Sequence, residues 1–499
     1  MVRKIRLKEL TLAVVLLFVE SGTLADESRP GKSAASLRVN SSRLEAGLEA
    51  LAAFGKTPEG GVNRAAFSES DLRARLFIRE MMIEAGLSVR LDEAGNIIGR
   101  LDGREAGLPA LTAGSHLDSV PNGGRYDGAL GVLAAVECCR TLRDNGIRLR
   151  HPLEVIVFAD EEGGLVGSRA MLGEFDDRAL DVVTQSGLTV REGIAAAGGN
   201  PANIKAARRG LNELAAYIEL HIEQGNVLDS RKFRIGIVEG IVGLERWEVE
   251  ITGTANHAGT TPMDNRQDAL VAAAQCIVAV NRTVTALPGR QVGTVGRIKA
   301  EPGAVNVIPG KVIMSLELRD LSMKKISSIF AAIQKEASLI AQKTRTKIHF
   351  SQPDAAQNPA ILDPGIIKLI SLSAMELGLS SLKMPSGAGH DAQNMARLAP
   401  TGMIFVPSVG GISHSPQEFS RPEDLEAGAN VLLITLVRLD GQSTHSTPRA
   451  EARGMRRVNT EQRFLPRFKN RGLAPSNVST VSEDLHFFSG TSHKPLSRS

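Results

Sequence analysis

The chain has 499 residues, which is long enough for more than one domain of the usual size, about 100–200 residues each. Apolar residues make up 42% and charged residues 23%, a balance typical of a globular protein. The formal charge of +4 comes from the ends, because residues 1–25 carry +2 and residues 441–499 carry +6. The remaining middle of the chain is therefore negative, which argues against a nucleic-acid-binding core.

Residues 1–25 have the features of an export signal. A basic start precedes an apolar run from Leu10 to Val19, and Thr23-Leu24-Ala25 is an acceptable cleavage site. The apolar run is about half as long as a membrane span requires, so we expect no stable span. We therefore predict export to a periplasmic or extracellular location. The alternative is a misassigned start, and the protein would then be cytoplasmic.

Helical and strand-like patterns alternate along residues 38–242. The predicted strands are apolar runs, and each ends in polar or charged residues. This alternation predicts an α/β fold with a mostly parallel sheet. The clearest strands cover residues 108–113, 153–159 and 214–220.

The pattern changes at residue 243. A strand, a helix, two strands, a long helix and a last strand follow in the order of a ferredoxin-like α+β domain. We predict this inserted domain over residues 243–355 and a return to the α/β pattern over residues 356–440. Residues 441–499 are rich in Ser, Thr, Arg and Pro without a sustained apolar period, which predicts a disordered basic tail.

Residues with metal-binding chemistry follow the predicted strands. His116 lies in the Gly-rich loop that follows the first strand, Asp118 comes two residues later, and Asp127 lies further along the same loop. Open α/β sheets bind ligands at the carboxyl ends of their strands. A carboxylate beside a ligating histidine usually accepts from its second ring nitrogen, so we expect Asp118 to bond His116 in this way.

The later strands end in similar residues. Glu161 and Glu162 follow the second strand, His221 ends the third, and His414 follows the strand predicted at residues 403–406. Singly these residues could be a solvated acidic turn and structural or loop histidines. Glu162, His221 and His414 join His116 and Asp127 in a set of three imidazoles and two carboxylates. One carboxylate could bridge two divalent ions about 3.5–4 Å apart, as in two-metal hydrolytic sites. Such a site favours anionic substrates and stabilises an oxyanion.

Several motifs now support a family resemblance. They are Gly-Ser-His-Leu-Asp-Ser, Tyr-Asp-Gly-Ala-Leu-Gly-Val, Asp-Glu-Glu-Gly, His-Ile-Glu-Gln-Gly, Asn-His-Ala-Gly-Thr-Thr-Pro-Met and Ser-Gly-Ala-Gly-His-Asp-Ala. In this order they resemble the hydantoinase/carbamoylase family of metal-dependent amidohydrolases, within the aminoacylase and dinuclear-carboxypeptidase clan. The resemblance covers about residues 38–440.

The resemblance implies two divalent ions, zinc or manganese, bridged by Asp127. His116 and His221 would complete one site, and Glu162 and His414 the other. It also implies that Glu161 is the general base that activates water and passes its proton to the leaving nitrogen. Asp118 is carried over as a member of the catalytic group.

The inserted domain would serve as a lid and as the interface of a homodimer. Its His257 resembles the family's oxyanion-stabilising histidine, and Asn306 and Arg319 resemble residues that bind the substrate carboxylate. The alternative for Arg319 is a strand-end ion pair with Asp320. Four more residues match positions that line the same pocket: Gln224, Arg246, Ala388 and Gly389.

The expected substrate is a small ureido acid, with N-carbamoyl-L-amino acids as the first choice. Allantoate or ureidoglycolate is the second choice, and a dipeptidase-like or aminoacylase-like activity is the third. His221 favours the carbamoylase branch, because peptidases of the clan usually have a carboxylate there. One departure from the family pattern is the shortened segment 162–169 beside the metal site. A catalytically inactive protein that binds ureido acids is the alternative from another functional class.

Overall fold

The computed structural model describes residues 36–353 and 356–442. The predicted export signal over residues 1–25 and residues 443–499 of the predicted tail lie outside the described residues. Within the described ranges, no helix is both long enough and apolar enough to cross a membrane.

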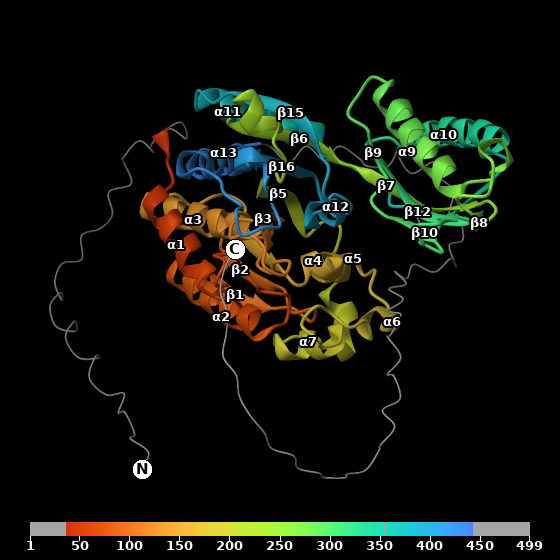
Figure 1. Ribbon diagram of the computed structural model, residues 1–499. Helices are drawn as coiled ribbons and strands as arrows, with labels where there is room; N and C mark the ends of the chain where they lie inside the picture. The colour runs from red at the N-terminus through yellow and green to blue at the C-terminus, as the bar shows by residue number, and fades with distance from the viewer. Residues whose placement is uncertain (1–35, 354–355, 443–499) are drawn as a thin grey trace, which may run out of the picture. The chain divides into compact units, whose positions relative to one another are not determined.

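A nine-stranded sheet forms the larger of two main sheets (Figure 1). Its strand order is β1-β2-β4-β3-β5-β16-β6-β14, and β15 pairs with β6. The strands are β1 (Ser88–Leu91), β2 (Ile97–Leu101), β3 (Ala110–His116), β4 (Leu153–Phe158), β5 (Leu214–Ile222), β6 (Ile235–Ile241), β14 (Ala360–Ile361), β15 (Ser381–Ser386) and β16 (Thr401–Val406).

The four central strands, β4, β3, β5 and β16, pair in parallel. This confirms the prediction of an α/β fold with a parallel core. Most pairings toward the sheet edges are antiparallel, which the alternating sequence pattern did not predict. Every residue of β3, β4 and β16 is buried, because helices cover both faces of the sheet.

Helices pack against this sheet in two hydrophobic clusters, one on each face. The long helices share the first cluster: α1 (Ser41–Ala52), α2 (Glu69–Glu84), α3 (Ala129–Asp144), α11 (Pro364–Glu376) and α13 (Pro422–Asp440). Short helices α5 (Val166–Leu172), α8 (Val227–Arg231) and α12 (Asp391–Met395) contribute to the second. The remaining α-helices of this part are α4 (Glu161–Gly164), α6 (Asp177–Leu180) and α7 (Val190–Ala196).

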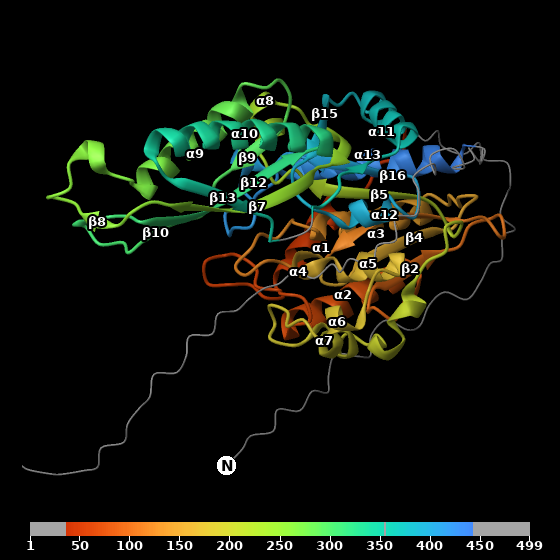
Figure 2. The ribbon, with the colours of Figure 1, turned by 90° about the vertical axis from the view of Figure 1, so that its right-hand side faces the viewer.

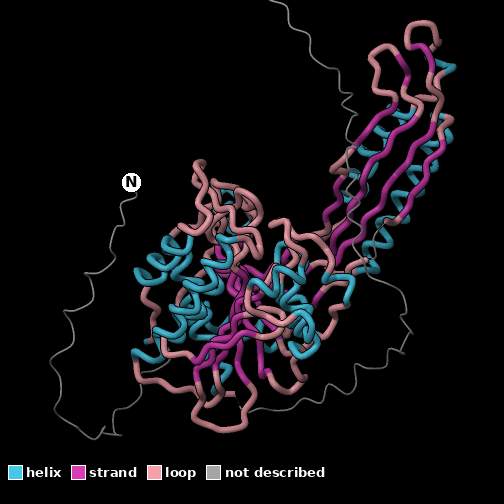
Figure 3. Tube along the Cα trace, turned by 90° about the horizontal axis from the view of Figure 1, so that it is seen from below, coloured by secondary structure: helices cyan, strands magenta, loops and turns pink. Residues whose placement is uncertain are grey.

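The second sheet has the order β10-β12-β7-β13, with β9 also paired to β12. Its strands are β7 (Gly243–Thr252), β9 (Val292–Thr294), β10 (Ile298–Glu301), β12 (Lys311–Asp320) and β13 (Lys347–Ser351). The helices α9 (Ala269–Thr285) and α10 (Met323–Thr344) lie side by side on one face (Figures 2 and 3). A separate two-stranded pair joins β8 (Asn256–His257) to β11 (Val307–Ile308).

The sequence pattern of β12 explains its one-sided packing. Its residues alternate between buried and partly buried, as expected for a strand with one face against helices. Trp247 of β7 stacks on Phe330 of α10 with ring centroids 3.9 Å apart. The first of the two strands predicted between the helices of this domain is instead divided into β9 and β10, and between them Arg297 N donates to Ser315 Oγ at 3.0 Å.

The register of the parallel strands determines where the site forms. His116 of β3 lies opposite Phe158 of β4, and His221 of β5 lies opposite Phe405 of β16. The ends of four neighbouring strands therefore meet at one rim of the sheet.

Candidate metal centre and active site

Two histidines form the floor of the site. His116 is the last residue of β3, His221 is the penultimate residue of β5, and both are 1% exposed. Nδ1 of His116 donates to the main-chain oxygen of Asp118, and Nδ1 of His221 donates to that of Ile222. These bonds leave Nε2 of each ring to act as a ligand.

Gly128 allows the histidine of β3 to occupy this position. Its φ is +66°, and a Cβ there would lie 2.5 Å from the ring of His116. Only glycine satisfies both the backbone conformation and this close approach.

Asp127 lies between two groups of candidate ligands. Its Oδ1 is 3.5 Å from His116 Nε2 and 3.2 Å from His221 Nε2. Its Oδ2 is 3.4 Å from His414 Nε2, which in turn is 3.5 Å from Glu162 Oε1. The structure thus brings all five predicted metal ligands together in two groups that share one carboxylate.

The spacing of these atoms fits divalent ions. Metal–ligand bonds of about 2.1 Å put tetrahedral ligands roughly 3.4 Å apart, close to the measured separations. In addition, Glu162 Oε1 is buried and has no hydrogen-bond partner. A buried oxygen without a donor is costly, and a cation in the second group would satisfy it.

Burial and the neighbouring charges shift the pKa values of the candidate ligands. Burial alone would lower the pKa of His116, but the carboxylates of Glu161 and Asp127 outweigh it and raise that pKa well above its usual range. The hydrogen bond to Asp127 raises the pKa of His414 to about 9. Burial raises the pKa of Glu162 to about 7 and that of Glu161 well above its usual range.

Asp118 has a different contact from the one predicted. Its carboxylate lies 3.7 Å from His116 Nδ1, and the main-chain oxygen of the same residue accepts the histidine proton. The carboxylate instead accepts from the main-chain nitrogens of Glu161 at 3.4 Å and Glu162 at 3.0 Å. The prediction was wrong because those nitrogens open a helix, where main-chain N–H groups have no acceptor within the helix and need one from outside it. Asp118 therefore fixes the segment that carries both glutamates.

The shortened segment after Glu162 forms two short helices. Helix α4 follows Asp160, whose φ is 53°, and Leu165, with φ 54°, turns the chain into α5. Glu161, at the start of α4, places Oε2 3.8 Å from His116 Nε2. It is thus within reach of the first ligand group, as the predicted general base should be.

Three of the predicted pocket residues lie on loops near these groups. Gln224 has a φ of 59° and donates from Nε2 to Asp127 Oδ2 at 2.7 Å. Ala388 and Gly389 follow β15, and the next residue, His390, is buried with its ring 4.5 Å from that of His221.

The two predicted arginines share a carboxylate. Glu317 Oε1 is 2.6 Å from Arg319 Nε, and its Oε2 is 2.6 Å from Arg246 Nε. Arg319 also donates to the main-chain oxygen of Gly387 at 2.6 Å. The alternative pairing with Asp320 is not formed, because that carboxylate pairs with Lys325 at 3.3 Å.

His257 and Asn306 lie at the other end of the second sheet. Ala258 N donates to Asn306 O at 2.9 Å, next to the short β8–β11 pair. Nδ1 of His257 accepts from Gly259 N and Thr260 N, so a neutral ring carries its proton on the exposed Nε2.

These two residues are far from the arginine pair within one chain. The β8–β11 pair adjoins Lys311, where β12 begins, and Arg319 lies near the end of that strand. A strand rises about 3.3 Å per residue, so Lys311 and Arg319 are roughly 26 Å apart. One small substrate therefore cannot contact residues at both ends of β12 in the same chain.

Sequence reasoning missed two buried residues at the site. Glu418 accepts from the main-chain nitrogens of Tyr126 and Asp127, and His390 contacts Ser386 Oγ at 2.8 Å. Burial lowers the pKa of His390 well below its usual range, so this ring is neutral. No local sequence pattern marked Glu418, because its contact is with a loop 292 residues away in sequence.

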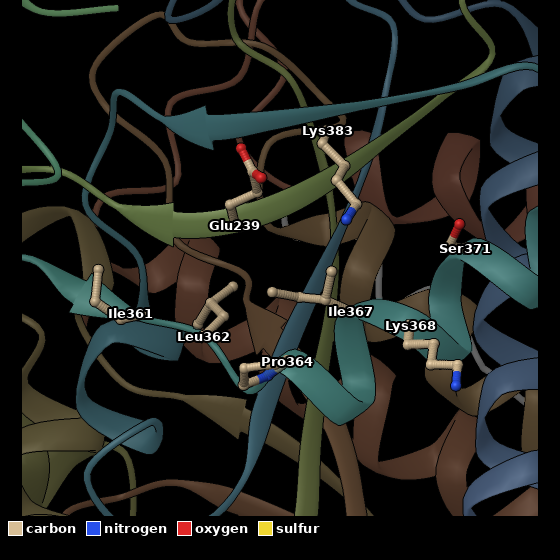
Figure 4. Close-up of a pocket in the computed structure, with 8 residues that line it drawn as sticks. All are labelled: Glu239, Ile361, Leu362, Pro364, Ile367, Lys368, Ser371 and Lys383. Atoms are coloured by element: carbon tan, nitrogen blue, oxygen red, sulfur yellow. The ribbon is translucent and has the colours of Figure 1, made fainter.

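A cavity of about 340 Å³ lies elsewhere, between β6, β15 and α11 (Figure 4). It contains none of the predicted site residues. The residues that line it are Glu239, Ile361, Leu362, Pro364, Ile367, Lys368, Ser371 and Lys383.

Comparisons with known proteins agree with this geometry. A model of Peptidase family M20/M25/M40 matches residues 112–438. An N-carbamoyl-L-amino acid amidohydrolase of Geobacillus stearothermophilus is 40% identical over 406 residues, which cover 80% of this chain and 99% of that protein. A ureidoglycolate hydrolase of Arabidopsis thaliana is 36% identical over 418 residues, with 81% and 88% covered.

A solved structure gives the same result. The crystal structure of a hydantoinase/carbamoylase family amidase from Burkholderia multivorans matches with a TM-score of 0.78 and 36% identity, over 82% of this chain and 99% of that one. The chain therefore belongs to Peptidase family M20/M25/M40, among its hydantoinase/carbamoylase amidohydrolases. The resemblance inferred from the motifs is confirmed, and the protein is an enzyme of this metal-dependent family.

Proposed function

We propose that this enzyme hydrolyses N-carbamoyl-L-amino acids with two divalent ions, zinc or manganese. The observation that carries the proposal is the pair of ligand groups that share Asp127, with Glu161 beside them. Water adds to the carbamoyl carbon, the bond from that carbon to the amino-acid nitrogen breaks, and the nitrogen gains a proton. The products are the free amino acid and carbamate, which decomposes to carbon dioxide and ammonia.

The ligand residues would hold the ions, and the remaining residues would handle protons and substrate. His116, Asp127 and His221 would hold one ion, while Glu162 and His414 would share Asp127 with the other. When bound, such ions supply Lewis acidity that acidifies water and polarises a carbonyl. Glu161 would take the proton from water at its carboxylate and deliver it to the leaving nitrogen.

The arginine pair would bind the substrate carboxylate. Arg246 and Arg319 bring two positive charges to one place, and Glu317 neutralises only one of them. The remaining positive charge suits one carboxylate, and a guanidinium can bind it through two parallel hydrogen bonds. N-carbamoyl amino acids and ureidoglycolate both meet this requirement.

We propose a homodimer in which each site is completed by the second subunit. The support is the separation of about 26 Å between the two ends of β12, estimated from strand geometry. His257 and Asn306 cannot reach a substrate held at Arg319 of their own chain. A second copy could supply them, with the protonated Nε2 of His257 available to an oxyanion.

A second candidate is the hydrolysis of ureidoglycolate or allantoate. The similarity to the Arabidopsis thaliana ureidoglycolate hydrolase favours it, and the ligand set does not discriminate between these substrates. The third candidate, a dipeptidase-like or aminoacylase-like activity, is disfavoured by His221 at the position where peptidases of the clan have a carboxylate.

After reconstitution with Mn²⁺ or Zn²⁺, the tests are an assay for released ammonia with the ureido acids and an assay for released amino acids with the dipeptides. N-carbamoyl-L-amino acids, ureidoglycolate, allantoate and dipeptides would be compared at equal concentration. The proposal predicts the highest kcat/KM for an N-carbamoyl-L-amino acid. Turnover of allantoate or ureidoglycolate alone would reject it. Failure to retain metal after reconstitution, with ureido-acid binding but no turnover, would favour the inactive binder.

We also propose export, supported by the basic start and apolar run of residues 1–25. Expression of the full chain with cell fractionation and N-terminal sequencing tests this. The expected result is a mature protein that begins after Ala25 in an exported fraction. An intact N-terminus in the cytoplasm would contradict it.

A further inference from the structure

A buried glutamate joins the two loops that carry metal ligands. Glu418 is 3% exposed and lies four residues after His414. Its Oε1 accepts from Tyr126 N at 2.9 Å and from Asp127 N at 3.1 Å. Its Oε2 accepts from Ser413 Oγ at 2.9 Å. One carboxylate therefore holds the backbone at Asp127 and the residue immediately before His414.

Ser413 extends this connection to the shared ligand itself. Its hydroxyl lies 3.2 Å from Asp127 Oδ2, the oxygen that faces His414. The hydroxyl has one proton, so it can donate to Glu418 or to Asp127 but not to both at full strength. Glu418 and Ser413 thus act on the half of Asp127 that belongs to the second ligand group.

The neighbouring backbone is shaped to admit the carboxylate. A Cβ at Gly124 would lie 2.0 Å from the carboxyl carbon of Glu418, so only glycine lets the loop approach this closely. The contact joins segments almost 300 residues apart in sequence, as the separation of 292 between Tyr126 and Glu418 shows.

The two ligand groups differ in how their members are held. His116 and His221 lie at the ends of adjacent buried strands, so the sheet itself fixes their separation. His414 lies on a loop with a φ of 54°, is about half exposed, and has no strand to hold it. The second group therefore depends on contacts between loops.

We propose that Glu418 is a positioning residue that sets the distance between Asp127 and His414. It thereby controls the affinity of the ion shared by Asp127, Glu162 and His414, with little effect on the ion at His116 and His221. This inference rests on the proposed two-metal function. It assigns a role in metal binding to Glu418, which is not itself one of the five proposed ligands. Removal of an outer hydrogen-bond partner typically weakens metal binding by roughly 10–100-fold.

The test is a titration of folded, metal-free protein with Zn²⁺ in a calorimeter. Wild type should show two binding events. Glu418→Ala should weaken one event by about 10–100-fold and leave the other within about twofold, while Glu418→Gln, which keeps an acceptor for the two main-chain nitrogens, should fall between. Glu423→Gln, on the exposed start of α13, is the matched control and should titrate like wild type.

A second variant separates positioning from simple loss of a carboxylate. Gly124→Ala keeps Glu418 but forces its carboxyl group away, so it should weaken the same event. Gly296→Ala is its control, because a Cβ at Gly296 meets only Ser315 Oγ, at 3.9 Å. If Glu418→Ala fails to fold, the zinc titration of Gly124→Ala still tests whether Glu418 positions the second ligand group.

Two results would overturn the inference. Equal weakening of both events would mean that Glu418 supports the site as a whole, and unchanged affinities with lower thermal stability would mean a purely structural role. A wild-type protein that binds fewer than two ions would instead reject the two-metal function, so the two failures are distinguishable.

Discussion

Adjacent glutamates face different partners at the site. Glu161 Oε2 is 3.8 Å from His116 Nε2, whereas Glu162 Oε1 is 3.5 Å from His414 Nε2. The main-chain nitrogens of both glutamates donate to the carboxylate of Asp118, which holds the two residues in place. This arrangement supports a division of labour, in which Glu162 ligates and Glu161 transfers protons.

Replacement of the base tests that division. Glu161→Gln keeps the shape of the side chain and removes its ability to take a proton. We expect kcat to fall by roughly 10²–10⁴-fold, the usual contribution of a general base, with metal content unchanged. The measurements are steady-state kinetics and elemental analysis of the same preparation. Loss of metal together with activity would show that the roles of Glu161 and Glu162 are exchanged.

The raised pKa values predict how metal binding responds to pH. The pKa of Glu162 is raised to about 7 and that of His414 to about 9, so both groups hold protons in the metal-free site at neutral or lower pH. Each must lose its proton to bind an ion. Affinity of the second group should therefore rise with pH, first through about 7 and then through about 9.

The stability of the metal-free protein depends on pH in the opposite direction from its metal affinity. A group whose pKa is raised by folding stabilises the folded state at low pH and loses that contribution as pH rises through the raised value. Metal-free protein should therefore lose stability between about pH 5 and pH 9, and bound ions should restore it. Titrations and thermal melts at pH 6, 7, 8 and 9 check both effects. An affinity that is constant or falls with pH would contradict them.

At the scale of elements, strand order decides the site. Strands β4, β3, β5 and β16 are neighbours and parallel, so residues from four distant segments meet at one rim. Apolar runs that end in polar residues are visible in a sequence, which is why the fold class and the cluster of ligands were predictable. The contacts of Asp118 and Glu418 could not be predicted from the sequence, because they depend on how distant loops pack against one another.

The position of helix α4 provides an element-scale prediction. Asp118→Ala removes the acceptor for Glu161 N and Glu162 N but keeps the main-chain oxygen that holds His116. We expect a large fall in kcat and weaker binding of the ion at Glu162, with the ion at His116 retained. Asp118→Asn, which keeps one acceptor oxygen, should be milder. Release of the His116 ion first would contradict this account.

Charge pairing on the second sheet also escaped sequence reasoning. Glu317 is a cross-strand neighbour of Arg246 and lies two residues before Arg319 on β12. The alternation of a strand could place all three on one face, but only the register of β7 against β12 brings them together. The nearest residue in sequence, Asp320, points to the other face and pairs elsewhere.

At the scale of the whole molecule, the distance between the two ends of β12 is the basis of the proposed homodimer. Arg319 lies near the end of β12, and the separate β8–β11 pair lies beyond the start of that strand, roughly 26 Å away. The homodimer proposed above solves this by pairing the arginines of one chain with His257 of the other.

Complementation between inactive variants tests this arrangement. His257→Ala and Glu161→Gln should each be nearly inactive alone. A mixed dimer has one site with an intact Glu161 from the first chain and an intact His257 from the second, so mixing followed by subunit exchange should restore activity. Light scattering should show a dimer. No recovery after verified exchange, or full activity of a monomer, would contradict the shared site.

The most direct test of the account is anomalous diffraction from crystals soaked with Zn²⁺. We expect two peaks about 3.5–4 Å apart on either side of Asp127, one beside His116 and His221 and the other beside Glu162 and His414. A single peak, or peaks away from Asp127, would contradict the two-metal centre on which the proposed hydrolysis depends.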